Sequence, residues 1–210
     1  VTPWKFDQVD FIQRDVFVDA YHVPCEITKN FIQQYTSKPI YVVGYWYNPE
    51  LWHPMNKQKY REEYNLSNEE FVIASFQRDT EGSDLKSPKL EKGPDLFCDY
   101  VEKLAKEKSV HVLLNGWRRQ YVMNRLNDAN IKFTYRELPP ISEVAKMYAA
   151  CDLYVVAARH EGGPQAVLEA PAMKVPIVST NVGMASETLP ENCVFNVKDG
   201  VYIPTKKDVE

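Results

Sequence analysis

The chain has 210 residues, of which 44% are hydrophobic and 26% charged, a composition typical of a globular protein. Its net charge of -4 disfavours a nucleic-acid-binding protein, which usually carries a basic excess. No apolar run approaches the roughly 20 residues that span a bilayer, and the first residues lack the apolar core of a signal peptide, so we expect a cytoplasmic protein without a transmembrane segment.

The sequence pattern of residues 1–55 does not predict a complete folding unit. Residues 18–23 and 39–45 are expected as strands, and residues 26–35 as a helix. The run 45–54 is aromatic and rich in turn residues, which is typical of a linker whose aromatic side chains pack against the protein. The cysteines, widely spaced and without a metal-binding pattern, are expected as buried free thiols: Cys25, Cys98, Cys151 and Cys193.

From residue 71 onward, strands and helices alternate. The apolar periodicity predicts strands at 71–76, 110–114, 131–135, 153–157 and 176–179, and helices at 92–108, 121–127, 141–150 (with Ser142 as its cap) and 165–173. This order predicts an α/β fold, a Rossmann-like parallel sheet with helices on both faces. Residues 79–91 are polar and are expected as a mobile surface loop. Ligands of such sheets bind outside the carboxyl ends of the strands.

The loop after residue 157 contains the richest chemistry. Glu161, Gly162, Gly163 and Gln165 precede or open a predicted helix, and Glu169 lies roughly two turns after Glu161. Glycines let a ligand approach the backbone closely, and a helix N-terminus offers unpaired N–H groups that suit a phosphate. A carboxylate accepts hydrogen bonds from the hydroxyl pair of a sugar or ribose. On pattern alone, an ordinary turn followed by a surface glutamate is the alternative.

Two cations belong to the same predicted edge of the sheet. Arg78 follows the strand at 71–76, and Lys92 with Gly93 lies beyond the polar loop. Together they would clamp a diphosphate. Each taken alone is equally well described as a solvated surface charge.

In this order, the motifs resemble glycosyltransferase family 4. Glu161, followed after seven residues by Glu169-Ala170 and then by 175–180 and 182–183, resembles its double-glutamate signature. The upstream pieces that agree are Arg78 with 92–96, Asn115-Gly116, 133–135 with Leu138, and 147–152. The resemblance covers about residues 40–190. Departures such as Pro171 for the usual Met and Lys174 for the usual Gly leave the transferred sugar open.

The resemblance implies a role for each charged residue. Arg78 and Lys92 would hold the donor diphosphate and stabilise its departing negative charge. Glu161 would bind hydroxyls of the transferred sugar, and Glu169 the ribose hydroxyls. The donor would be a sugar on a nucleotide diphosphate of UDP or GDP type, transferred with retention of configuration. The resemblance implies no bound metal and no further cofactor.

The remaining site residues follow from the same resemblance. The backbone around Gly162, Gly163 and Gln165 would meet the phosphate and the sugar. Tyr135 and Arg136 would flank the base.

The resemblance also implies a two-lobed GT-B architecture. Residues 1–45 would be a remnant of the N-terminal lobe with the crossing between lobes, and residues 46–210 the nucleotide-sugar-binding domain. The acceptor, a glycan, lipid or other molecule, would bind mainly to the rest of the N-terminal lobe. A start at Val1 and an end at Glu210 lead us to expect a fragment or a domain of a longer protein, cytoplasmic or peripheral to a membrane, that synthesises a polysaccharide or glycoconjugate.

Two alternatives stay open at this point. The chain would be a nucleotide-sugar-binding module without turnover of its own if its parent were much shorter than the roughly 350 to 420 residues of the two-lobed enzymes. A sugar-nucleotide epimerase of the same architecture would have different glutamate and histidine contexts.

Overall fold

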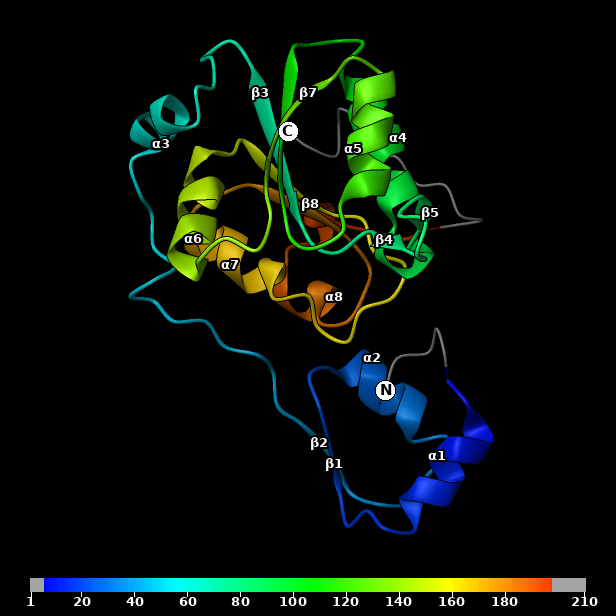
Figure 1. Ribbon diagram of the computed structural model, residues 1–210. Helices are drawn as coiled ribbons and strands as arrows, with labels where there is room; N and C mark the ends of the chain where they lie inside the picture. Colours follow the sequence, from blue (N-terminus) through cyan, green and yellow to red (C-terminus); the bar gives the residue numbers. More distant parts are fainter. Residues whose placement is uncertain (1–5, 198–210) are drawn as a thin grey trace.

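The computed structural model describes residues 6–197, which form a small N-terminal unit and a larger sheet domain. An extended segment joins the two, drawn in cyan in Figure 1. The small unit pairs two short parallel strands and packs its helices around Phe11, Val23 and Ile32. Its elements are α1 (Gln8–Asp15), β1 (Tyr21–Val23), α2 (Glu26–Ile32) and β2 (Ile40–Val42).

The larger domain is built on a six-stranded sheet in which every pair of neighbours is parallel. The strand order is β10-β9-β8-β3-β6-β7, which places β7 at one edge. This confirms the predicted Rossmann-like sheet. The strands are β3 (Phe71–Phe76), β6 (Val110–Asn115), β7 (Lys132–Arg136), β8 (Leu153–Val156), β9 (Ile177–Thr180) and β10 (Val194–Phe195).

Helices cover both faces of this sheet, as predicted (Figure 1). Alternate residues of a strand point to opposite faces, so Val72 and Ala74 of β3 belong to one apolar core and Ile73 belongs to the other. The first core lies under α3 (Lys57–Glu63), α6 (Ile141–Ala150), α7 (Ala166–Ala172) and α8 (Ala185–Thr188). The second lies under α4 (Pro94–Leu104) and α5 (Gln120–Asp128).

Several local predictions differ from the structure. α4 begins at Pro94 instead of residue 92, because Gly93 adopts a left-handed φ of 59° and ends the short 3-10 helix η2 (Leu90–Lys92). Ser142 does not cap α6: Pro140 occupies the N-cap position, where no side chain caps the helix. The sequence analysis missed the helix α1, although Asp7 caps it by accepting a hydrogen bond from the Asp10 N–H at 2.9 Å.

The polar segment 79–91 is not a plain surface loop. It contains an antiparallel hairpin of β4 (Thr80–Glu81) and β5 (Ser87–Pro88). Asp79 and Thr80 are fully buried, because the Asp79 carboxylate pairs with the buried guanidinium of Arg119. The prediction that this segment is mobile without ligand stays a prediction.

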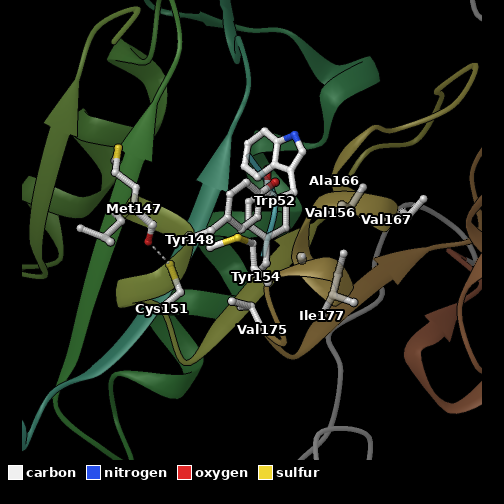
Figure 2. Packing of buried hydrophobic residues seen from close by; sticks show 14 of the residues in the cluster. Trp52, Met147, Tyr148, Cys151, Tyr154, Val156, Ala166, Val167, Val175 and Ile177 are labelled. Atoms are coloured by element: carbon white, nitrogen blue, oxygen red, sulfur yellow. Dashed lines mark hydrogen bonds between the residues drawn. The ribbon is translucent and has the colours of Figure 1, made fainter. Parts of the chain in front are cut away.

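Of the two tryptophans in the aromatic segment 45–54, only Trp52 packs into the core. Trp52 is 5% exposed and meets the Tyr148 ring edge-on at 5.5 Å, whereas Trp46 is 78% exposed. Figure 2 shows Trp52, Tyr148 and Tyr154 together in the first core. All the cysteines are free thiols, as expected, but Cys193 is only partly buried. Cys151 donates to the carbonyl of Met147 at 3.0 Å.

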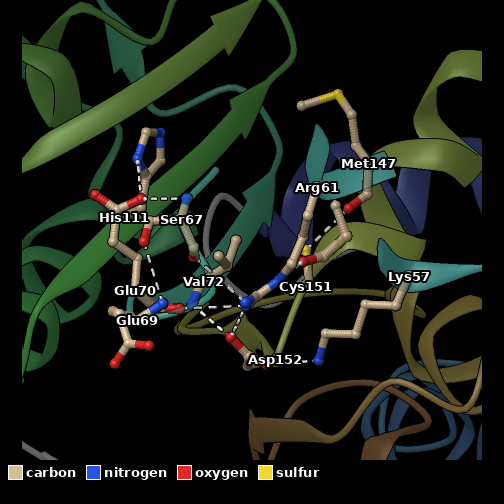
Figure 3. Close-up of polar contacts among 11 residues, drawn as sticks. Lys57, Arg61, Ser67, Glu69, Glu70, Val72, His111, Met147, Cys151 and Asp152 are labelled. Carbon is tan, nitrogen blue, oxygen red and sulfur yellow. Dashed lines mark hydrogen bonds and ion pairs between the residues drawn. The ribbon is translucent and has the colours of Figure 1, made fainter. Parts of the chain in front are cut away.

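A polar network ties α3 to the sheet at the amino ends of the strands, away from the carboxyl ends where ligands of such sheets bind (Figure 3). The Asp152 carboxylate pairs with Arg61 and Lys57 and accepts from the Val72 N–H at 2.7 Å. Burial lowers the pKa of His111, near this network, and the neighbouring Glu70 carboxylate opposes that shift. The Asp152 carboxylate thus joins α3 to the sheet through Arg61, Lys57 and Val72, so we assign the network to holding the fold.

Candidate active site

A cavity of about 310 Å³ opens at the carboxyl ends of β3, β6 and β8, where the topology predicts ligand binding. Strand ends form its floor, and α6, α7 and the loop before α7 form its walls. It is lined by Phe76, Gln77, Lys92, Asn115, Val144, Tyr148, Tyr154, Val155, Val156, Glu161, Gly163, Pro164, Gln165, Ala166 and Glu169. Five of the predicted site residues therefore meet in one place: Lys92, Glu161, Gly163, Gln165 and Glu169.

Lys92 and Glu161 form an ion pair at this cavity, with 2.5 Å between Nζ and Oε1. Their segments are held close because Gly93 lies directly against Ala157: a Cβ on Gly93 would come 1.8 Å from the Ala157 carbonyl oxygen. Only glycine satisfies both this approach and the left-handed φ. The backbone packing therefore fixes where the Lys92 ammonium meets the Glu161 carboxylate.

A second ion pair locks the same two segments. The guanidinium of Arg159 donates to both carboxylate oxygens of Asp95, at 2.7 and 2.6 Å, and also to the Leu90 carbonyl at 3.0 Å. Burial alone would raise the pKa of Asp95, but the hydrogen bonds and charge of Arg159 outweigh burial and hold that pKa below its usual value. The pair fixes the start of α4 to the loop that carries Glu161.

The glycine turn before α7 exposes backbone donors. In the part of the chain that the structure describes, the N–H groups of Gly163, Gln165 and Ala166 donate to no protein acceptor. Gly183, with a φ of 52°, lies against this turn: a Cβ there would come 2.7 Å from the Gly162 carbonyl oxygen. The turn is thus held from outside while its donors stay available to an anion.

Glu169 lies in the first turn of α7, closer to the loop than the sequence predicted, because the helix begins only at Ala166. The Tyr148 hydroxyl donates to its carboxylate at 3.0 Å. Burial raises the pKa of Glu169 above its usual value, and the hydrogen bond from Tyr148 opposes that rise in part. A half-buried carboxylate with one donor still has lone pairs for ligand hydroxyls.

Four predicted site residues do not line this cavity. The Arg78 guanidinium stacks 4.9 Å from the Trp117 ring centroid and donates to the Thr80 carbonyl at 3.2 Å. Tyr135 and Arg136 end the edge strand β7, two strands away from β3, and Gly162 lines a neighbouring cavity. Strand order and the stacking on Trp117 explain these positions, and neither is readable from the local sequence.

The family model described as glycosyl transferases group 1 matches residues 84–210. The chain belongs to this family.

Solved structures agree with this assignment at the level of the fold. The Anabaena protein Alr3699/HepE in complex with UDP and glucose superposes with a TM-score of 0.74 at 14% identity, covering 94% of this chain and 56% of that chain. Sucrose-phosphate synthase from Thermosynechococcus elongatus gives a TM-score of 0.71 at 14% identity, and the match covers 98% of this chain and 51% of the synthase chain. The C-terminal domain of the group 1 family protein LpcC from Francisella tularensis gives a TM-score of 0.58 at 17% identity. That match covers 74% of this chain and 82% of the LpcC domain.

At these identities the likeness shows the fold alone: the sheet domain has the fold of the C-terminal lobe of GT-B glycosyltransferases. The chain spans about half the length of the first two structures. No curated protein is similar enough to count as a match.

In this glycosyltransferase lobe, the sequence analysis gave no site role to several residues that line the cavity, among them three polar ones. Gln77, next to the predicted Arg78, donates to the Lys92 carbonyl at 2.9 Å. Tyr148 holds Glu169, and its position in a helix gave no local signal. Asn115 did carry a signal, because it is the polar end of the mostly apolar strand β6.

A second cavity, of about 440 Å³, lies between the glycosyltransferase lobe and the small unit. Glu161, Gly162 and Gly163 line it from one side, and Tyr21 and His22 from the other. The two parts also touch directly: the Cys25 thiol donates to the Gly162 carbonyl at 3.4 Å. Glu161 and Gly163 therefore face both cavities.

Two negative findings concern residues 6–197. They contain no cluster of three or more His, Cys, Asp or Glu side chains that could hold a metal ion. None of their helices combines the length and the apolar character needed to cross a membrane.

Proposed function

We propose that this chain supplies the donor site of a retaining glycosyltransferase of family 4, which transfers a sugar from a UDP- or GDP-sugar to an acceptor. The observation that carries the proposal is the Lys92–Glu161 pair, 2.5 Å apart, beside a turn with free backbone N–H groups. A cation and unpaired donors suit a diphosphate, and the adjoining carboxylates suit hydroxyls. The structural neighbour in complex with UDP and glucose supports a donor of the UDP type.

Each of the five predicted residues that line the cavity receives a role in this proposal. Lys92 and the backbone around Gly163 and Gln165 hold the diphosphate, Glu161 binds hydroxyls of the transferred sugar, and Glu169 binds the ribose hydroxyls. The bond between the anomeric carbon and the diphosphate oxygen breaks, and its electron pair leaves with the diphosphate. The acceptor hydroxyl oxygen forms the new bond to the anomeric carbon, and its proton passes to the diphosphate. The Lys92 ammonium stabilises that developing charge. Nothing in this scheme requires a bound metal or a further cofactor.

The other predicted residues enter the proposal from outside the cavity. Arg78 would reach the diphosphate only by leaving Trp117. Gly162 would contact the sugar from the neighbouring cavity, and Tyr135 with Arg136 would flank the base from the edge of the sheet.

We also propose that residues 1–45 are part of the N-terminal lobe and residues 46–210 the donor domain of a two-lobed enzyme. The acceptor would bind mainly to the rest of the N-terminal lobe and approach Glu161 through the cavity between the two parts. The whole protein would act in polysaccharide or glycoconjugate synthesis in the cytoplasm, either free or at a membrane surface.

The decisive experiment is a calorimetric titration of the chain with UDP-, GDP- and ADP-sugars and with the free nucleotides. We expect one base to bind. Glu161→Gln should spare the free nucleotide and damage transfer in the longer enzyme, whereas Glu169→Gln should also weaken the free nucleotide. Each should cost about 1 to 3 kcal/mol in its own assay. Binding of none of these ligands would refute the proposed donor site.

A binding module without turnover is the second candidate. Finding nucleotide-sugar binding together with a natural protein no longer than this chain would decide for the module.

A further inference from the structure

Asn115 ends β6 and lines the cavity with a side chain that the proposed roles do not use. The residue is 7% exposed. Its amide nitrogen has one protein partner, the sulfur of Met147 at 4.0 Å. Within residues 6–197, no donor is paired with its side-chain oxygen. The carboxamide is therefore buried at the cavity with most of its hydrogen-bonding capacity unused.

This polar side chain ends a mostly apolar strand. A carboxamide offers two N–H donors and an oxygen with two lone pairs, and a thioether sulfur is a weak acceptor. At the wall of the cavity, the unused donor and acceptor positions of Asn115 are accessible to a ligand. The preceding residues of β6 are mostly apolar, so packing alone would favour a leucine here.

The surroundings of Asn115 match one part of the donor. The charged pair Lys92–Glu161 lies at the glycine turn, and Glu169 follows it one turn into α7. On the α6 side, the lining changes to Val144 and to the rings of Phe76 and Tyr148, which meet edge-on at 4.9 Å. An apolar lining with one polar group is the usual environment of a recognised flat ligand group.

We infer that Asn115 recognises the nucleobase of the donor. Its N–H donates to a ring carbonyl, and its oxygen accepts from the adjacent ring N–H, a pair of groups that uracil and guanine both present. The aromatic and aliphatic neighbours cover the base. The inference rests on the proposed function and adds to it the residue that reads the base.

The test compares ligands with and without a base. Calorimetry of the chain with UDP, GDP and inorganic pyrophosphate is carried out for the wild type, Asn115→Leu and Asn124→Leu, a matched change at an exposed position on the opposite face of the sheet. Asn115→Leu should weaken the preferred nucleotide by about 3- to 10-fold, the scale of one or two neutral hydrogen bonds. It should leave pyrophosphate binding and the melting temperature undiminished, because leucine has a similar size.

A methylated base gives a second test that needs no variant to fold. 3-Methyluridine diphosphate, or 1-methylguanosine diphosphate if guanine is preferred, lacks the ring N–H. It should bind more weakly than its parent nucleotide to the wild type, but equally to the Asn115→Leu variant.

Two results would overturn this inference and leave the proposed function intact. In the first, Asn115→Leu binds the nucleotide as tightly as the wild type does. In the second, Asn115→Leu loses as much affinity for pyrophosphate as for the nucleotide. A wild-type chain that binds no nucleotide would instead overturn the proposed function, and with it this inference.

Discussion

Two pairs of loops meet at the same edge of the sheet, and each is locked by an arginine–aspartate pair. Arg159 and Asp95, with side chains 18% and 26% exposed, join the start of α4 to the loop before α7. Arg119 and Asp79, both fully buried, join the ends of β3 and β6. The Arg159–Asp95 pair holds the segments that place the charged side chains of Lys92 and Glu161 at the cavity. The charges of Arg119 and Asp79 neutralise each other inside the protein.

The two arginine–aspartate pairs differ in which side chains of their segments remain free to face the cavity. Arg119 also donates to the carbonyls of Ser75 and Asn115, at 2.6 and 2.9 Å, so its charge serves the backbone. Only the neutral side chains of Gln77 and Asn115 then face the cavity from these loops. An arginine–aspartate pair therefore supports each end of the cavity. The end near Arg159 and Asp95 presents charged side chains, and the end near Arg119 and Asp79 presents neutral ones.

The largest expected effect comes from breaking the buried lock. Arg119→Met leaves the Asp79 carboxylate without its partner and should destabilise the protein by about 3 to 5 kcal/mol in urea unfolding. Lys146→Met removes a solvent-accessible partner of Glu63 and should cost clearly less, because ion pairs at the surface contribute little to stability. Equal losses in the two variants would show that the Arg119 pair contributes no more than a surface contact.

The next effect tests the close approach that supports the charged end. Gly93→Ala places a Cβ against the Ala157 carbonyl and forces a left-handed φ, and should cost about 2 to 4 kcal/mol. Gly162→Ala is the matched control, because a Cβ there has no neighbour within 4 Å. If thermal unfolding gave the same midpoint for both variants, the approach of Gly93 to Ala157 would be wrong.

The third effect separates the two predicted cations. Lys92→Met should weaken UDP or GDP binding by about 1.5 to 3 kcal/mol, the scale of a charge-assisted hydrogen bond. Arg78→Met should cost less than about 1 kcal/mol, because the guanidinium stacks on Trp117 and does not line the cavity. A calorimetric loss in Arg78→Met as large as that in Lys92→Met would mean that Arg78 moves to the diphosphate on binding.

The smallest effect is a pH dependence at Glu169. Partial burial raises the pKa of this carboxyl above 4.5, its usual value. Protonation removes the negative charge and turns one of the two acceptor oxygens into a donor. Affinity for a UDP- or GDP-sugar should therefore fall as the pH is lowered towards that raised pKa. We expect a loss of about 1 kcal/mol, measured by calorimetry.

Glu169→Gln is the control for that pH dependence, because glutamine keeps the size of the side chain but does not titrate in this range. A nucleotide-sugar, unlike a free nucleotide, adds no terminal phosphate that titrates nearby. An unchanged pH profile in Glu169→Gln would assign the dependence to another group.

The sequence by itself determined the alternation of strands and helices and therefore the parallel sheet. Apolar periodicity is local: β3 falls at residues 71–76 and α6 at 141–150, as predicted, because each element must bury one side or both. The double-glutamate motif was also readable, because the loop, the helix start and both carboxylates lie within nine residues of one another along the chain.

Only the tertiary structure decided how the cavity is completed. Gly93 meets Ala157, Tyr148 meets Glu169, and Arg78 stacks on Trp117, and each contact joins residues from different elements. The order of the strands is likewise absent from any local pattern: it sets β7 at the edge beside β6, where Arg136 pairs with Asn115 but lies outside the cavity lining. Local periodicity reports which side of an element is buried, whereas the partner it is buried against depends on the whole chain.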